Sequence, residues 1–216
     1  MLMETQMPKL LVATANPGKR REIAAILGGF GVELVWPEQA GGLPVVPEEG
    51  DGYQENALAK ARAAASASGL PALAEDSGLE VEALGGRPGP RSARLAGPKA
   101  DDQANNRKLL KMLEGVPWEA RACRYVCVAA IALPDGRVEV AQGECRGRVG
   151  FEPRGSGGFG YDPLFVLEDR GCTMAQLPAA EKDRISHRGR ALARLLPRML
   201  ALLGVRPGGE GASASG

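Results

Sequence analysis

ARACRYVCVAAIALPDGRVEVAQGECRGRV, residues 120–149, places Pro-Asp-Gly between two runs that are rich in strand-forming residues. A turn of this kind between such runs predicts an antiparallel hairpin. Upstream of it, short apolar runs alternate with helical patterns. Early strands that alternate with helices, followed by a hairpin, are typical of a sheet with parallel and antiparallel pairs. The sequence therefore predicts a mixed α/β sheet.

The other elements can be predicted from apolar spacing, caps and breakers. Strands are expected at 9–15, at 32–36, at 70–84 (where the strand runs into an acidic turn) and at the end of 155–166. Helices are expected at 17–27, 53–68, 101–115 and 185–204, the last interrupted by Pro197. Residues 37–52 and 85–98 are expected to be loops. We expect one folded unit over 7–205 and a disordered tail at 206–216.

The composition is ordinary for a globular protein, with 44% hydrophobic and 25% charged residues among 216. A net charge of +1 disfavours nucleic acid or an anionic membrane as the main partner. No apolar run could span a bilayer and the first residues lack the order of a signal peptide, so a cytoplasmic location is expected. The four cysteines contain no C-x-x-C pair, which favours buried reduced thiols over zinc ligands or disulfides.

The segment TANPGK, residues 14–19, connects the first strand to the first helix. It is not a Walker A loop, because Ala13 stands where that motif has its first Gly and Arg20 follows Lys19. Asn16 can cap the helix and Pro17 suits its first position. The free N–H groups of the helix start, with Lys19 nearby, could hold phosphate. The alternative is a plain capped helix with a solvated basic first turn.

Two adjacent carboxylates, Glu75 and Asp76, lie in LAEDSG, residues 73–78. In an extended segment they point to opposite faces, so only one is expected to face a given cleft. Such a carboxylate could hold Mg²⁺. The alternative is an Asp-Ser-Gly turn that satisfies only its own backbone.

Two later segments could complete a nucleotide site. In GSGGFGYDP, residues 155–163, the glycines allow close approach of a ligand, and Phe159 and Tyr161 could stack on a base. A bulged hairpin with core aromatics is the alternative. In AEKDRISHRGRAL, residues 180–192, Lys182 and Ser186 to Arg188 lie near a helix start. His187, the only histidine, could be an acid or base, although a lone surface histidine more often has no role. Because no Ser or Cys is placed as its partner, we favour ligand contact over nucleophile activation.

Five motifs, in order, resemble those of the inosine triphosphate pyrophosphatase family, the enzymes that remove non-standard purine nucleoside triphosphates. These motifs are TANPGK, ENALAKA, AEDSGLEVEALGGRPGPRSAR, GFGYDPLF and EKDRISHRGRAL, and they cover nearly the whole expected folded region. The resemblance implies a two-lobed mixed sheet flanked by helices, with the active site in the cleft between the lobes, and usually a homodimer. It also implies Mg²⁺-dependent hydrolysis of inosine, deoxyinosine or xanthosine triphosphate to the monophosphate and pyrophosphate.

The resemblance also assigns roles to residues. Asp76 would be the metal ligand and general base, with Glu75 as a second candidate ligand. The residues implied to bind substrate are Thr14, Ala15, Asn16, Pro17, Gly18, Lys19, Ser77, Phe159, Gly160, Tyr161, Asp162, Lys182, His187 and Arg188. Glu49 or Glu55 could assist the metal, and the spacing does not choose between them.

Three other functions compete with this interpretation. A pyrophosphatase of the septum-associated Maf type would act on pyrimidine triphosphates, but SHR and FGYD argue against it. A nucleotide sensor could use the same pocket without catalysis, although it would not need the Asp76 carboxylate. A nucleic-acid-binding module is opposed by the near-neutral charge.

Overall fold

A computed structural model of the chain describes residues 7–46 and 52–205. The predicted disordered tail and Glu49 lie outside the described residues. The strands are β1 (Lys9–Val12), β2 (Glu33–Val35), β3 (Ala72–Val81), β4 (Pro88–Gly89), β5 (Ala122–Ala132), β6 (Val138–Val149), β7 (Phe165–Leu167) and β8 (Cys172–Thr173). The α-helices are α1 (Pro17–Leu27), α2 (Tyr53–Ser68), α3 (Asp102–Met112), α4 (Ala179–Ile185) and α5 (His187–Leu202). Short 3₁₀ helices are η1 (Pro37–Gln39), η2 (Glu82–Leu84), η3 (Ser92–Arg94), η4 (Trp118–Ala120) and η5 (Met174–Gln176).

All the described strands belong to one sheet in the order β2-β1-β3-β5-β6-β7-β8, with β4 paired to β3. β1 runs parallel to β2 and β3, and every other pair is antiparallel. The predicted hairpin is β5–β6, with Pro134, Asp135 and Gly136 between its strands. The predicted mixed sheet is therefore confirmed.

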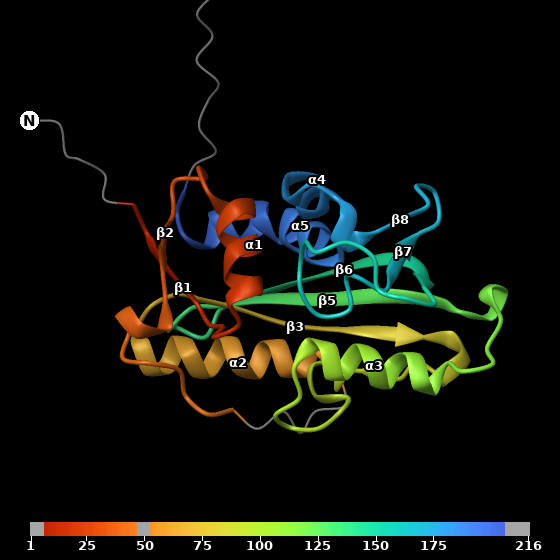
Figure 1. Cartoon of the computed structure of the whole chain (residues 1–216). Coiled ribbons are helices and arrows are strands. Elements are labelled where there is room, and N and C mark those ends of the chain that lie inside the picture. The colour runs from red at the N-terminus through yellow and green to blue at the C-terminus, as the bar shows by residue number, and fades with distance from the viewer. Residues whose placement is uncertain (1–6, 47–51, 206–216) are drawn as a thin grey trace, which may run out of the picture.

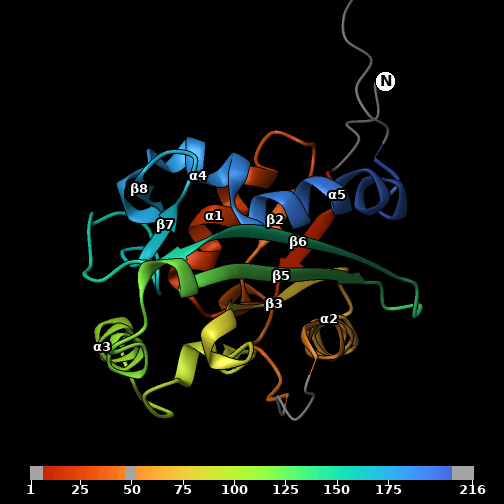
Figure 2. The same ribbon diagram turned by 90° about the vertical axis from the view of Figure 1, so that its right-hand side faces the viewer.

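Helices cover both faces of this sheet. α1, α4 and α5 lie on one face, and α2 and α3 lie on the other (Figures 1 and 2). Apolar side chains of β1, β3 and β5 pack against α1 and α5 on the first face, and against the alanines of α2 on the second. Gly143 of β6 lets α5 approach closely, because a side chain there would clash with the backbone of the helix at His187 and Ala191.

Three predictions about elements were wrong. β3 does not turn at Glu75 and Asp76 but continues to Val81, because these residues pair with Ala129 and Val128 of β5. The expected loop at 85–98 contains β4 and η3, where the absence of a side chain at Gly78 lets Gly89 approach β3. α5 begins after a separate helix α4, and its helical span continues through Pro197.

Within the described ranges, no helix has both the length and the apolar character needed to cross a membrane.

Candidate active site

The start of α1 places the positive end of the helix dipole next to a lysine. Asn16 caps the helix, and its Oδ1 accepts from the Lys19 backbone N–H at 3.0 Å. The first turn holds no acidic side chain. Arg20 turns away, since its Nε donates to the Thr14 carbonyl at 3.0 Å and its guanidinium pairs with Glu38. Of the two basic residues, Lys19 is therefore the one placed to meet an anion.

The carboxylates of β3 point to opposite faces of the sheet, as predicted. Glu75 faces α1 and α5, and its Oε1 lies 2.9 Å from Lys19 Nζ and 3.0 Å from Arg188 Nη2. Asp76 faces α2, where Lys60 Nζ lies 2.9 Å from Oδ1 and Asn56 Nδ2 donates to Oδ2 at 3.1 Å. Burial alone would raise the pKa of Glu75, but Arg188 and Lys19 outweigh it and hold that pKa below its usual range.

Most of the predicted phosphate residues line one pocket together with Glu75; Asp76 is not among its lining residues but contacts Lys60, which is. That pocket is lined by Ala13, Thr14, Ala15, Asn16, Lys19, Leu43, Pro44, Val46, Lys60, Ala64, Glu75 and Ala93. Lys60 was not predicted individually, although it lies within ENALAKA, one turn after Asn56 and on the same face of α2. Glu55 is exposed on α2 and is not among the residues of this pocket.

A second pocket adjoins the first through Asn16 and Lys19. Its lining comprises Asn16, Lys19, Ser77, Gly78, Ser92, Ala93, Asp102, Asn105, Tyr125, Phe159, Gly160, Tyr161, Asp162, Lys182, His187 and Arg188. The Phe159 ring lies against Gly18, where any side chain would clash with it. Lys182 Nζ and Arg188 Cζ lie 5.0 and 5.4 Å from the centre of that ring. An aromatic face and buried cations thus meet in one pocket.

Buried charges link the two pockets in alternating sign. Arg188 pairs with Glu75 and also with Glu22 of α1, and Glu22 Oε1 lies 2.6 Å from Lys182 Nζ. Lys182 in turn pairs with Asp162. Sequence reasoning missed Glu22, although it follows Gly18 by one helical turn and therefore shares its face of α1.

The histidine is not on the surface, contrary to expectation. His187 is buried, and its ring stacks on Tyr125 at 4.5 Å between centroids. Burial, helped by the nearby charge of Arg188, holds the pKa of His187 well below its ordinary value, so the ring is neutral at pH 7.

The remaining predicted residues mostly make hydrogen bonds to the segments around the pocket. Tyr161 donates its hydroxyl to the Ser92 carbonyl at 2.7 Å and packs in the core rather than across the pocket. Ser186 caps α5 by accepting from the Gly189 N–H at 3.1 Å. The Ser77 hydroxyl accepts from Arg188 Nη2 at 3.3 Å.

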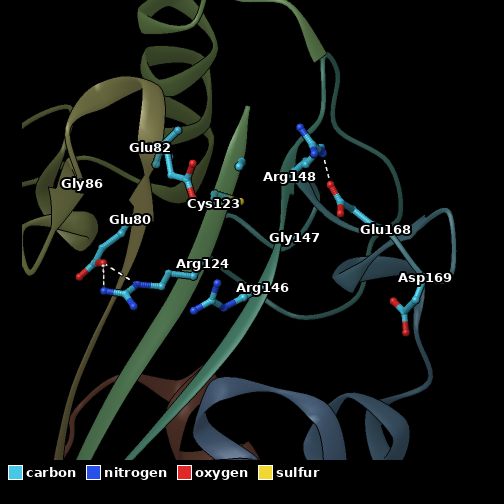
Figure 3. Close-up of a pocket in the computed structure, with 12 residues that line it drawn as sticks. Glu80, Glu82, Gly86, Cys123, Arg124, Arg146, Gly147, Arg148, Glu168 and Asp169 are labelled. Carbon is cyan, nitrogen blue, oxygen red and sulfur yellow. Dashed lines mark hydrogen bonds and ion pairs between the residues drawn. The ribbon is translucent and has the colours of Figure 1, made fainter. Parts of the chain in front are cut away.

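A third, separate groove lies farther along β3, β5 and β6 (Figure 3). Its arginines already have acidic partners: Arg124 pairs with Glu80 and Glu144, and Arg148 pairs with Glu168. This groove lacks the helix N-terminus and the aromatic face of the first two pockets.

The fold and the paired pockets define an α/β protein with a cleft suited to a phosphorylated ligand that carries a planar ring. Comparison with known proteins specifies the family. The Ham1 family profile matches residues 10–198, and the chain belongs to this family. The family expected from the motifs is thus confirmed.

Individual relatives agree with this assignment. The dITP/XTP pyrophosphatase of Geobacter sulfurreducens is 52% identical, over 88% of this chain and 95% of that protein. The dITP/XTP pyrophosphatase of Symbiobacterium thermophilum is also 52% identical, over 90% and 96%. A solved HAM1 protein from Coxiella burnetii superposes with a TM-score of 0.81 at 36% identity, covering 90% of this chain and all of that one. The predicted two-lobed mixed sheet flanked by helices is confirmed by this likeness.

Proposed function

We propose that this protein hydrolyses non-standard purine nucleoside triphosphates, those of inosine, deoxyinosine and xanthosine, to the monophosphate and pyrophosphate. The observation that carries this proposal is the pair of adjoining pockets that share Asn16 and Lys19. One pocket offers cations and a helix N-terminus for phosphates, and the other offers Phe159 and buried cations for a base. The relatives named dITP/XTP pyrophosphatase support the same activity.

In this proposal the α1 end of the cleft holds the triphosphate. Thr14, Asn16 and Lys19 line that pocket. Cleavage between the α- and β-phosphates leaves new negative charge on pyrophosphate. Lys19 and the N–H groups of α1 are placed to stabilise this charge, which favours pyrophosphate as the leaving group.

The residues on β3 fit the Mg²⁺ that the resemblance implies. Among the described residues, no group of three or more His, Cys, Asp or Glu side chains forms a metal cage. Mg²⁺ usually takes only one or two carboxylates and completes its shell with substrate phosphates and water. Asp76 would hold it, with Glu75 as a second candidate. When bound, Mg²⁺ would neutralise phosphate charge in the cleft.

Contacts with α2 hold the Asp76 carboxylate in place. Its two oxygens are held by Lys60 and Asn56, so the carboxylate has a fixed orientation. We propose that it orients the attacking water and accepts its proton, with no covalent intermediate.

We propose that base selectivity comes from the pocket under Phe159. A 6-oxo purine offers an acceptor where adenine offers an amino donor. Arg188 lines this pocket and carries only donors, which would favour the 6-oxo bases.

Three broader properties complete the proposal. We propose that residues 7–205 act as one pyrophosphatase domain and that the protein works as a homodimer. A cytoplasmic location agrees with four cysteines that are all free thiols. Light scattering on a sizing column would test the dimer.

One assay tests the proposed function. Purified protein with Mg²⁺ is given deoxyinosine, xanthosine and all ordinary nucleoside triphosphates, and pyrophosphate and orthophosphate are measured separately. We expect pyrophosphate, released fastest from the deoxyinosine and xanthosine substrates. Asp76→Asn should lose roughly 10²- to 10⁴-fold in rate while keeping its melting temperature within a few degrees.

The possible outcomes separate the competing functions. Equal turnover of adenosine triphosphate would remove the selectivity claim. A preference for pyrimidine triphosphates would favour a Maf-type enzyme. Orthophosphate as the first product would contradict α–β cleavage, and tight binding without turnover would favour a sensor.

A further inference from the structure

Helix α3 holds both backbone polar groups of Gly160. The Gly160 N–H donates to Asp102 Oδ2 at 2.7 Å, and Asn106 Nδ2 donates to the Gly160 carbonyl at 3.0 Å. Asp102 and Asn106 are four residues apart, so both side chains extend from one face of the helix. α3 covers the same sheet face as α2, whereas the loop that carries Gly160 runs past α1 and α4 from the other face (Figure 1). These two hydrogen bonds therefore tie α3 to the Gly160 loop, and the two segments also share one apolar cluster through Leu109 and Tyr161.

The contact of Asp102 with Gly160 does not arise because Asp102 caps α3, since another residue is the cap. Asp101 caps the helix, with its Oδ1 accepting from the Ala104 N–H at 2.7 Å. The next residue, Asp102, is thus not needed as the cap and extends to Gly160 instead. Asn106 is 7% exposed, so its donor is directed to the Gly160 carbonyl inside the protein rather than to solvent.

A third side chain of the same helix holds another segment that lines the pocket. Asn105 accepts from the Ala96 N–H at 2.8 Å and donates to the Ala93 carbonyl at 3.1 Å. Ala93 and Gly160 both line the pocket that contains Phe159. The first turns of α3 thus hold two separate segments that line that pocket.

Gly160 is where the chain turns directly after Phe159. Its φ of +63° is in the left-handed region, which suits glycine and turns the chain sharply after Phe159. On the other side of this turn, the Phe159 N–H donates to Asp162 Oδ2 at 2.8 Å, and Lys182 holds Asp162. Releasing Gly160 from α3 would leave Phe159 held by Asp162 at its backbone and by the Gly18 contact at its ring.

We propose that Asp102 and Asn106 are positioning residues for the nucleobase: they hold Gly160 so that Phe159 lies in place against the base pocket. The proposal rests on the proposed function, because it assumes that the Phe159 pocket receives the base. Both residues hold Gly160; Asp102 also lines the base pocket itself, and neither residue lines the phosphate pocket. Their loss should therefore weaken substrate binding without slowing the chemical step.

The polarity of the two hydrogen bonds gives a directional test. Position 102 needs an acceptor, so Asp102→Ala should raise KM for inosine triphosphate roughly three- to tenfold, while Asp102→Asn stays near wild type. Position 106 needs a donor, so Asn106→Ala should raise KM similarly. Asn106→Asp should be worse, because a carboxylate would face the Gly160 carbonyl. In all four variants kcat should stay within about twofold of wild type.

Two further measurements separate positioning from a general loss of structure. The inhibition constant of tripolyphosphate, which has no base, should be the same in every variant. Gln103→Ala is the matched control, because Gln103 is exposed in the same turn of α3. It should match wild type in KM, in melting temperature and in tripolyphosphate inhibition.

Hydrogen exchange tests the contact without any substrate. Peptides that contain Gly160 should exchange about fivefold faster or more in Asp102→Ala than in wild type or Gln103→Ala. Unchanged exchange, unchanged KM, or a parallel rise in KM and in the tripolyphosphate constant would each overturn the proposal. If the wild type releases no pyrophosphate, the proposed function fails, and hydrogen exchange still decides whether α3 holds the loop.

Discussion

Two glutamate–arginine pairs on strand β3 differ far more in burial than in distance. Glu75 lies 3.0 Å from Arg188, and Glu80 lies 2.8 Å from Arg124. The side chains of the first pair are 3% and 2% exposed, whereas those of the second are 23% and 43% exposed. The Glu80–Arg124 pair has the shorter distance, yet it is the one whose charges water can solvate in place of the partner.

This difference indicates what each pair contributes. Two charges in water are already solvated, so an exposed pair changes the free energy of unfolding by only about 0–1 kcal/mol. Buried charges have lost their water, and each depends on its partners to stay ionised. Arg188 compensates two buried carboxylates, Glu75 and Glu22, and so joins the phosphate pocket to the base pocket. The Glu80–Arg124 pair, in the groove of Figure 3, joins only the neighbouring strands β3 and β5.

The largest effect should follow the loss of Arg188. Arg188→Met keeps the bulk of the side chain but leaves Glu75 and Glu22 without their shared cation. We expect the free energy of unfolding to fall by about 3–5 kcal/mol, as measured by urea denaturation at pH 7. Adding Glu75→Leu to this variant should recover part of the loss, because it removes a buried carboxylate that would otherwise keep Lys19 as its only nearby cation. A loss below about 1 kcal/mol would mean that water reaches this cluster.

The second effect is a pH dependence that the exposed pair should lack. Burial and the nearby Arg188 hold the pKa of His187 well below 6.5, so the folded protein keeps this ring neutral. The unfolded chain takes up a proton as the pH falls through about 6.5. The free energy of unfolding should therefore decrease by up to about 1.4 kcal/mol per pH unit below that point, until the folded-state pKa is reached.

Since His187 is the only histidine, the assignment of this slope is simple. Urea denaturation at pH 7.0, 6.0 and 5.5 would measure it, and His187→Phe keeps an aromatic ring against Tyr125 while removing the titrating group. We expect this variant to show a much flatter pH dependence over the same range. An equal slope in the variant would assign the effect to carboxyl groups.

The contrast between the two pairs also shows what the sequence can predict. The cap at Asn16, the β5–β6 hairpin and the opposite directions of Glu75 and Asp76 depend on local spacing, and all were predicted. The role of Glu22 depends on Arg188, 166 residues later in the chain, and no local pattern indicates such a partner. Likewise, β3 continues through its acidic residues because β5 pairs with it, which local propensity cannot show. The motifs predicted residues that the structure brings into two adjoining pockets, whereas the buried charges between them required the structure.

The smallest effect should come from the exposed pair. Arg124→Gln removes the partner of Glu80 and Glu144 in the groove, and we expect the free energy of unfolding to change by less than about 1 kcal/mol. Whatever difference remains should shrink further in about 0.5 M salt, because screening acts on solvated charges. The loss in Arg188→Met should persist at the same salt concentration, since mobile ions do not reach its partners. If Arg124→Gln cost as much as Arg188→Met, the groove would have to be covered in solution, and sedimentation would then show association of the chain.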